Sequence, residues 1–322
     1  MSVTIIFGGQ YGSEGKGKVA HFFAKKINAK YCVRVGGPNS GHTVYSNDQK
    51  FIFRQLPTGS ILNNTISVLP AGSYIDISIL KKEIDVSGLN SDRLIIDENA
   101  IVMNDDYREK ELNLIKNIGS TGSGTGEAVL ARIRRDGKVL LARDCKELKK
   151  YINDTKNVLR QACRKKEKII AEGTQGFGLS LLHANEYPYT TSRDTSAASI
   201  LSEIGLSPFD VKNIVMVIRT FPIRVSGNSG PLKNEISWNL LQNELGREED
   251  MKEYTSCTNR IRRVARFDEE LVKRSITCNN PNIIVMNHLD YCKNSNYIQE
   301  VEDKIGHKIN YFGDSPKNLF EV

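Results

Sequence analysis

The chain of 322 residues is 39% hydrophobic and 26% charged, so it can bury a large core, and no stretch approaches the roughly 20 uninterrupted apolar residues of a membrane span. Its net charge of +7 suits nucleic acid or polyanionic small molecules, but no RNA-binding aromatic pattern, zinc-finger spacing or basic tail occurs, which favours nucleotide ligands. The chain shows no signal peptide and no Cys-x-x-Cys pair, so we expect a cytoplasmic protein with free thiols and one domain over residues 1–322.

Short apolar runs recur along the chain and have helix-like stretches between them. We expect strands at Val3–Phe7, Tyr31–Val35, Ile66–Leu69, Leu94–Ile96, Lys168–Ala171, Ile214–Ile218 and Ile283–Met286, and helices at Asp105–Asn117 and Cys145–Lys165. This alternation predicts an α/β fold with a largely parallel central sheet flanked by helices, with smaller subdomain insertions. Glycine-bearing segments follow several strands, and ligands of such sheets bind where the strands end.

The first glycine-rich segment directly follows the first strand and reads Gly-Gln-Tyr-Gly-Ser-Glu-Gly-Lys-Gly-Lys over residues 9–18. Its glycines let backbone N–H groups close on an anion, and the N-terminus of a following helix adds its dipole. The sequence therefore predicts a P-loop-like phosphate site. It is not a Walker A motif, because Gly17 stands where that motif has Ser or Thr after the lysine.

Two further glycine-rich motifs carry polar side chains. Residues 36–43 read Gly-Gly-Pro-Asn-Ser-Gly-His-Thr and follow the second expected strand, which makes His42 either a structural histidine or a general acid with a pKa near the working pH. Residues 119–126 read Gly-Ser-Thr-Gly-Ser-Gly-Thr-Gly and precede Arg132, Arg134 and Arg135. Such a loop offers N–H and O–H donors for a phosphate, and the alternative is a flexible surface loop with a solvated basic helix.

Three more motifs complete the series. Glu-Gly-Thr-Gln-Gly at 172–176 has Tyr-Pro-Tyr-Thr-Thr-Ser downstream at 187–192, and either could be an ordinary turn. Thr-Asn-Arg-Ile-Arg-Arg-Val at 258–264 provides closely spaced arginines that suit a dicarboxylate, or an exposed basic face. Asn-His-Leu-Asp at 287–290 ends the last strand, where an aspartate could accept hydrogen bonds from a guanine.

These six motifs resemble, in order, those of the adenylosuccinate synthetases, and they span residues 8–290. The resemblance implies a ligase in which the purine O6 attacks the γ-phosphoryl group of a nucleoside triphosphate, and the aspartate amine then displaces phosphate at C6. It also implies Mg²⁺ and a homodimer. The family's loop aspartate, a catalytic base and magnesium ligand, is replaced here by Ser13, which cannot be an anionic base near neutral pH.

The resemblance implies a role for each matching position. His42 is the expected general acid, Lys16 and Mg²⁺ stabilise charge, and Gln175 contacts the purine. The catalytic set is thus Ser13, Lys16, His42 and Gln175, and the metal ligands are Ser13 and Gly41. The nucleotide-binding residues are Gly12, Glu14, Gly15, Lys16, Gly17, Asn39, Gly41, Thr43, Ser120, Thr121, Arg135, Gln175, Thr191, Asn287, Asp290 and Gly313, and the aspartate-binding residues are Thr258, Arg260 and Arg262.

Within the family, this chain resembles the bacteriophage 2-aminoadenylosuccinate synthetases in its short length and in the serine at position 13. Those enzymes join aspartate to dGMP with ATP or dATP. That resemblance implies dGMP and L-aspartate as substrates, an adenine donor with GTP as an option, and, for a phage protein, the host cytoplasm. A neutral hydroxyl leaves room beside N1 for the 2-amino group of guanine. The alternatives are an adenylosuccinate synthetase that uses IMP and GTP, a guanine-nucleotide switch and a nucleic-acid-binding protein.

Overall fold

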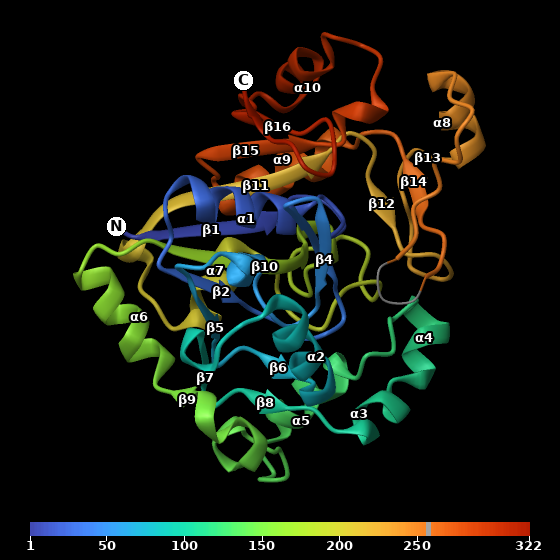
Figure 1. The fold of residues 1–322 in the computed structure, drawn as a ribbon. Helices are drawn as coiled ribbons and strands as arrows, with labels where there is room; N and C mark the ends of the chain where they lie inside the picture. The colour runs from blue at the N-terminus through green and yellow to red at the C-terminus, as the bar shows by residue number, and fades with distance from the viewer. Residues whose placement is uncertain (256–258) are drawn as a thin grey trace.

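A computed structural model describes residues 1–255 and 259–322. A ten-stranded sheet runs through the molecule in the order β17-β16-β15-β11-β1-β10-β2-β5-β7-β9 (Figure 1), and every neighbouring pair is parallel except β16 and β17. Its strands are β1 Val3–Gly8, β2 Tyr31–Arg34, β5 Ile66–Leu69, β7 Leu94–Asp97, β9 Ile152–Asn153, β10 Ile169–Gly176, β11 Val211–Arg219, β15 Ile283–Asn287, β16 Tyr311–Phe312 and β17 Phe320–Glu321. The predicted α/β class with a largely parallel sheet is confirmed.

The α-helices lie around this sheet and on the insertions between its strands. They are α1 Lys16–Lys26, α2 Ile77–Ser87, α3 Asp105–Lys110, α4 Leu112–Ile118, α5 Thr125–Arg134, α6 Thr155–Arg164, α7 Ala197–Ile204, α8 Trp238–Leu245, α9 Glu269–Asn279 and α10 Tyr297–Ile305. No helix in the described ranges is long and apolar enough to cross a membrane.

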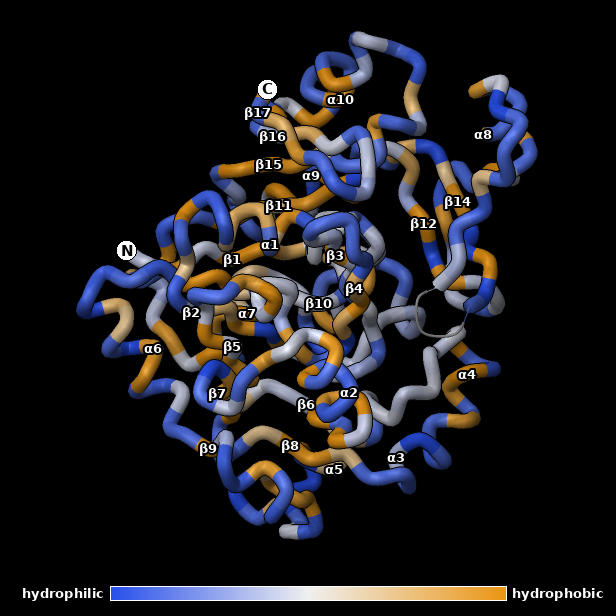
Figure 2. Tube along the Cα trace, in the orientation of Figure 1, coloured by the Kyte–Doolittle hydropathy of each residue, from blue (hydrophilic) through white to orange (hydrophobic). Residues whose placement is uncertain are grey.

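Alternate residues of the central strands enter two different apolar cores, as expected of a sheet that is covered on both faces. Val3, Ile5 and Phe7 of β1 pack in a core with residues of α6, α7, α9 and α10, whereas Ile6 packs in another core with α1. Figure 2 shows the hydrophobic residues concentrated along β1, β11 and β15. This two-sided burial explains why the strands are near-continuous apolar runs in the sequence.

Three small sheets form the predicted insertions. They are the hairpin β3 His42–Ser46 with β4 Gln49–Phe53, the parallel pair β6 Tyr74–Ile75 with β8 Ile101–Val102, and the antiparallel sheet of β12 Ile223–Arg224, β14 Arg263–Ala265 and β13 Glu235–Ile236. The last of these sheets and α8 lie to the right of the central sheet in Figure 1. Because β14 contains Arg263–Ala265, this small sheet brings the arginine motif toward the end of β11.

The seven predicted strands are present, but the structure corrects three boundaries. The helix predicted over Asp105–Asn117 is two helices, α3 and α4, which meet at Glu111. The helix predicted over Cys145–Lys165 is wrong in its first half, because Lys146–Tyr151 is a 3₁₀ turn followed by β9, and Asp154 then caps α6 by accepting from Asn157 N. Strand β10 continues to Gly176, so the motif at 172–176 lies within the strand.

Candidate active site

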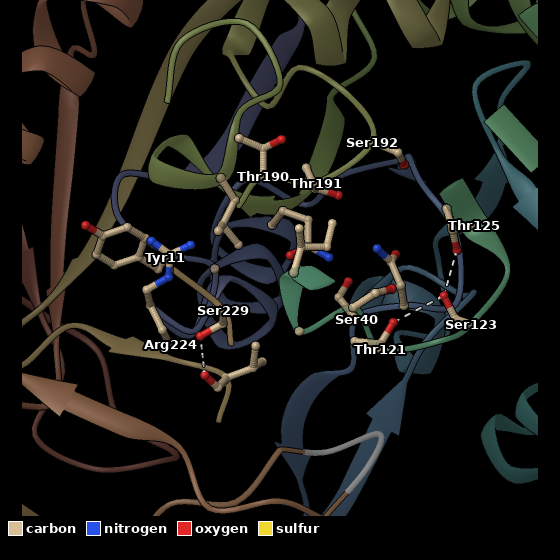
Figure 3. Close-up of a pocket in the computed structure, with 18 of the residues that line it drawn as sticks. Tyr11, Ser40, Thr121, Ser123, Thr125, Thr190, Thr191, Ser192, Arg224 and Ser229 are labelled. Atoms are coloured by element: carbon tan, nitrogen blue, oxygen red, sulfur yellow. Dashed lines mark hydrogen bonds between the residues drawn. The ribbon is translucent and has the colours of Figure 1, made fainter. Parts of the chain in front are cut away.

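One pocket collects residues from five of the six motifs at the carboxyl ends of β1, β2 and β10. Of the predicted site residues it is lined by Gly12, Ser13, Asn39, Gly41, Ser120, Thr121, Gln175, Thr191 and Arg262. These positions lie far apart in the sequence, and the parallel sheet places them together because its strands end at the same edge. In Figure 3, Tyr11 and Arg224 lie on one side of this pocket and a row of hydroxyl side chains lies on the other.

The loop between β1 and α1 has the geometry of an anion site, and its own glutamate occupies it. Glu14 Oε1 accepts from the backbone N–H groups of Gln10 at 3.0 Å and Gly12 at 2.7 Å, and Oε2 accepts from Lys16 Nζ at 2.8 Å. Both side chains of this ion pair are fully buried. Backbone donors and a lysine that converge on a carboxylate are the groups that would also bind a phosphate.

Gly17 is required by the packing of α1 against the second motif. A Cβ at this position would lie 2.9 Å from His42 Cβ and 3.0 Å from both Thr43 O and Thr58 Cγ2. The Ser or Thr of a Walker A motif therefore does not fit here. The chain departs from that motif because His42 lies directly against the start of α1.

His42 and Glu172 form a buried imidazole–carboxylate pair. His42 Nδ1 lies 2.5 Å from Glu172 Oε1, and Glu172 Oε2 accepts from Thr58 N at 2.8 Å and Thr58 Oγ1 at 2.9 Å. The carboxylate fixes the proton on Nδ1 and leaves Nε2 as the reactive nitrogen, which is buried and has no hydrogen-bond partner among the described residues. His42 is thus built like a catalytic base or acid held ready by its neighbour rather than like a satisfied structural histidine.

The charges around the pair act in opposite directions. Burial and the Arg34 guanidinium lower the pKa of His42 to about 4, and the contact with Glu172 acts against this. Burial acts to raise the pKa of Glu172, but the hydrogen bond from His42 and the Arg34 charge bring it below its ordinary value. Glu172 therefore stays ionised, and His42 is neutral until an added negative charge favours its protonation.

Ser13 lies at the wall of the pocket and contacts the arginine motif. Its hydroxyl accepts a hydrogen bond from Arg262 Nη1, and its carbonyl accepts one from Arg219 Nη1 at 3.0 Å. Arg262 also donates from Nε to Tyr254 O at 3.1 Å. The first and fifth motifs are therefore in direct contact, 249 residues apart in sequence, and the group that Arg262 meets on the phosphate loop is neutral.

A row of hydroxyl groups lines the opposite wall. Thr121 Oγ1 donates to Ser123 Oγ at 3.3 Å, and Ser123 Oγ lies 3.0 Å from Thr125 Oγ1 (Figure 3). Behind them, the buried Glu111 carboxylate accepts from Gly124 N at 2.8 Å and Gly126 N at 2.5 Å, at the N-terminus of α5. Neutral donors on a loop whose backbone is fixed in this way suit a phosphate ester.

The sixth motif lies on the other side of the phosphate loop and outside this pocket. Asn287 Nδ2 donates to Glu14 O at 2.7 Å, while its Oδ1 is buried without a partner among the described residues. A Cβ at Gly313 would contact both Lys18 Nζ and Asn287 Oδ1, so these groups crowd together. Asp290 is partly buried, and burial raises its pKa. The two sides of the P-loop thus offer two separate polar subsites.

The remaining predicted residues are placed less centrally. Arg260 is exposed, Arg135 is the exposed C-cap residue that follows α5, and neither lines the pocket. Thr43 pairs with Ile52 in the hairpin, and Gly15 is the N-cap residue before α1, with a φ of +86°. Thr258 lies outside the described residues.

Sequence reasoning missed the side chains that hold the site together. Glu172 was within a motif but had no assigned role, although a carboxylate in a buried strand is a signal by itself. Glu111, Arg219 and Arg224 were not singled out, yet each is almost fully buried and charged. Arg224 stacks over Tyr11 at 4.7 Å from the ring centre and donates to Tyr189 O at 2.9 Å.

The oxygen atoms on the pocket wall fit a magnesium ion only in part. Ser13 and Gly41 line the same pocket, and a hydroxyl and a carbonyl oxygen are ligands that Mg²⁺ accepts. The described residues contain no group of three or more His, Cys, Asp or Glu side chains that could hold a metal. An ion bound here would therefore depend mainly on substrate phosphates and water for its ligands, and would polarise the transferred phosphoryl group.

Comparison with known proteins agrees with this geometry. The sequence profile of the adenylosuccinate synthetase family matches residues 5–142 and 138–303. Adenylosuccinate synthetase of Methanococcus vannielii is 37% identical over 98% of this chain and 97% of its own length, and that of Methanocaldococcus jannaschii is 36% identical over 90% and 83%.

Two solved structures are similar over nearly the whole chain. Succinoaminodeoxyadenylate synthetase (PurZ) of cyanophage S-2L, bound to dGMP and to dATP as an energy donor, is 28% identical with a TM-score of 0.86 and covers 99% of this chain and 95% of that one. Fully ligated adenylosuccinate synthetase of Plasmodium falciparum is 20% identical with a TM-score of 0.88 over the full length of both chains, and shares the fold. The chain therefore belongs to the adenylosuccinate synthetase family and is a C–N ligase that joins aspartate to a purine nucleotide.

Proposed function

We propose that this ligase joins L-aspartate to C6 of dGMP, through a 6-phosphoryl intermediate, to give 2-amino-2′-deoxy-N6-succinyladenylate for diaminopurine DNA. The observation that carries the proposal is the neutral Ser13 on the pocket wall. A loop aspartate there would place a charge and an additional oxygen beside N1, whereas a hydroxyl leaves space for the 2-amino group of guanine and can accept from it. The likeness to PurZ, which was solved with dGMP, supports the same acceptor.

In this proposal His42 and Lys16 serve the phosphoryl transfer. His42 Nε2, which has no partner among the described residues, donates to the developing charge on O6, and Glu172 stabilises the imidazolium that this requires. Lys16 Nζ leaves the Glu14 carboxylate for the γ-phosphoryl group, which presents the same kind of oxygen. Gln175, at a φ of +62° near the end of β10, contacts the purine.

The acceptor phosphate binds the hydroxyl wall at Ser120, Thr121 and Thr191, where neutral donors face the pocket. Arg135, the C-cap residue of α5, does not line this pocket, which suits the proposal that in a homodimer it reaches the acceptor phosphate bound to the other subunit. L-aspartate binds at Arg262, with Arg260 and Thr258 as its further ligands.

The donor is proposed to be ATP or dATP, bound at Asn287, Asp290 and Gly313. His288 stands in place of the family's lysine in this segment, and PurZ was solved with dATP as its energy donor. Asp290 argues for guanine, because a carboxylate accepts well from guanine N1–H and N2–H, so GTP is the competing donor.

A second candidate is an adenylosuccinate synthetase that uses IMP and GTP. The names of the archaeal relatives at 36% and 37% identity favour it. A substrate matrix separates the two: IMP, GMP, dIMP and dGMP are each combined with ATP, dATP and GTP at saturating L-aspartate, and phosphate release is followed. The proposal expects dGMP to give the highest kcat/KM. An IMP rate that exceeds the dGMP rate about ten-fold would establish the second candidate.

A further inference from the structure

The largest fully buried side chain of the described structure is Arg219, at the end of β11, and the mechanism above does not use it. Its backbone N–H donates to Gln10 Oε1 at 2.9 Å, and its carbonyl accepts from Gln10 Nε2 at 3.1 Å. Its guanidinium donates from Nη1 to the Ser13 carbonyl at 3.0 Å. Both the backbone and the side chain of Arg219 are therefore attached to the phosphate loop.

The same guanidinium forms an ion pair with Glu253. Arg219 Nη1 donates to Glu253 Oε2 at 3.1 Å, and Nη2 donates to Glu253 Oε1. The Glu253 backbone carbonyl accepts from Arg262 N at 2.8 Å. Glu253 is thus linked by a backbone hydrogen bond to Arg262, whose side chain reaches the Ser13 hydroxyl on the pocket wall.

The turn that follows β15 also contacts this ion pair. Tyr291 OH donates to Glu253 Oε1 at 3.0 Å, and Tyr291 ends the 3₁₀ turn Leu289–Tyr291 that contains Asp290. The ring of His288 lies 5.4 Å from the ring of Tyr291. The Glu253 carboxylate thus accepts hydrogen bonds from Arg219 on β11 and from Tyr291, which follows the segment 287–290 proposed to bind the donor base and called here the donor-base segment. The Glu253 backbone carbonyl accepts from the arginine motif.

We propose that the Arg219–Glu253 ion pair is a positioning device that couples occupancy of the donor-base segment to the affinity for L-aspartate at Arg262. The inference rests on the proposed function, which assigns donor and aspartate to these two places. A base that binds at 287–290 restrains Tyr291, Tyr291 restrains the Glu253 carboxylate, and Glu253 restrains the backbone of Arg262. By linkage, aspartate must then strengthen donor binding by the same factor.

The test measures the KM for L-aspartate at donor concentrations far below and far above the donor KM, with the acceptor and donor that the wild-type enzyme prefers. We expect saturating donor to lower the wild-type aspartate KM about five-fold or more. The coupling ratio is the aspartate KM at low donor divided by the aspartate KM at saturating donor. Tyr291→Phe, which removes one hydroxyl and keeps the ion pair, is expected to bring this ratio below about two, to leave the acceptor KM unchanged and to lower the Tm only slightly through the lost hydrogen bond.

A matched control is Tyr297→Phe, because Tyr297 OH lies nearby but donates to Thr220 O, at 3.1 Å, instead of to Glu253. It is expected to keep the wild-type ratio. Arg219→Lys retains the charge but lacks the planar fork, so it is expected to fold and to lose the coupling.

The outcomes separate the two proposals. A wild-type ratio near one, or full coupling in Tyr291→Phe, overturns the positioning role even where dGMP is the acceptor. A preference for IMP in the substrate matrix overturns the dGMP assignment only. The coupling ratio is then measured with IMP as the acceptor and still tests the positioning role. Loss of coupling in Tyr297→Phe as well as in Tyr291→Phe would also count against a specific path through Glu253.

Discussion

Glu172→Gln tests the central chemical feature of the site, the carboxylate that holds His42. The amide keeps the size of the side chain and can still accept from Thr58, but it removes the negative charge whose oxygen lies 2.5 Å from His42 Nδ1. A unit charge at about 4 Å contributes about 4 kcal/mol at an effective dielectric constant of about 20. This corresponds to about three pKa units of lost support for the imidazolium.

Since the pKa of His42 is already lowered to about 4 by burial and Arg34, this loss falls directly on the general acid. We expect kcat to fall about 10²- to 10³-fold at pH 7, within the usual range for general acid–base catalysis, with nucleotide KM values nearly unchanged. The deficit is expected to stay constant at pH values above the pKa that His42 has in the substrate complex and to shrink only below it, where the wild-type imidazole is already fully protonated and only the variant still gains protons. Phosphate release at saturating substrates measures kcat from about pH 5 to 9.

The matched control is Glu83→Gln. Glu83 is also a buried carboxylate, and it accepts from the backbone N–H groups of Arg54, Gln55 and Leu56 rather than from His42. It is expected to lower stability and to keep kcat. If Glu172→Gln retains kcat within about three-fold of wild type and a normal pH profile, the pair is structural and the assignment of His42 as the general acid is wrong.

Three other perturbations test further residues of the candidate site. Ser13→Asp is expected to lower kcat/KM for dGMP about ten-fold or more. Because it adds a carboxylate ligand, it is also expected to lower the Mg²⁺ concentration needed for half-maximal rate. If both values are unchanged, Ser13 does not determine the choice of acceptor. Arg262→Leu is expected to raise the L-aspartate KM by about two orders of magnitude with poor rescue by Lys, while Arg266→Leu, which loses an exposed ion pair, should not change it. The free energy of unfolding is expected to fall by up to about 3 kcal/mol from pH 6.5 to 4, because the unfolded chain binds a proton that buried His42 resists, and His42→Phe should flatten this part of the denaturation profile.

The apolar runs and the glycine-rich motifs were enough to predict the central strands and the chemistry of the loops. Val3–Phe7 and Ile214–Ile218 are apolar because the sheet is covered on both faces, and this pattern is visible without coordinates. The glycine spacing at 8–17 identified an anion loop because few other residues permit that backbone. Motif order then identified the family.

The pairs of residues that act together could not be predicted and are visible only in the folded protein. Glu172 meets His42 across 130 residues, and Arg219 meets Ser13 across 206, because parallel strands bring their carboxyl ends to one edge of the sheet. Gly17 looked like a missing Walker hydroxyl, and the structure explains it by the close approach of His42 Cβ. Likewise, the predicted helix over Asp105–Asn117 breaks at Glu111, whose carboxylate instead binds the N-terminus of α5. Local propensity cannot reveal such partners, since each contact is created by the packing of distant segments.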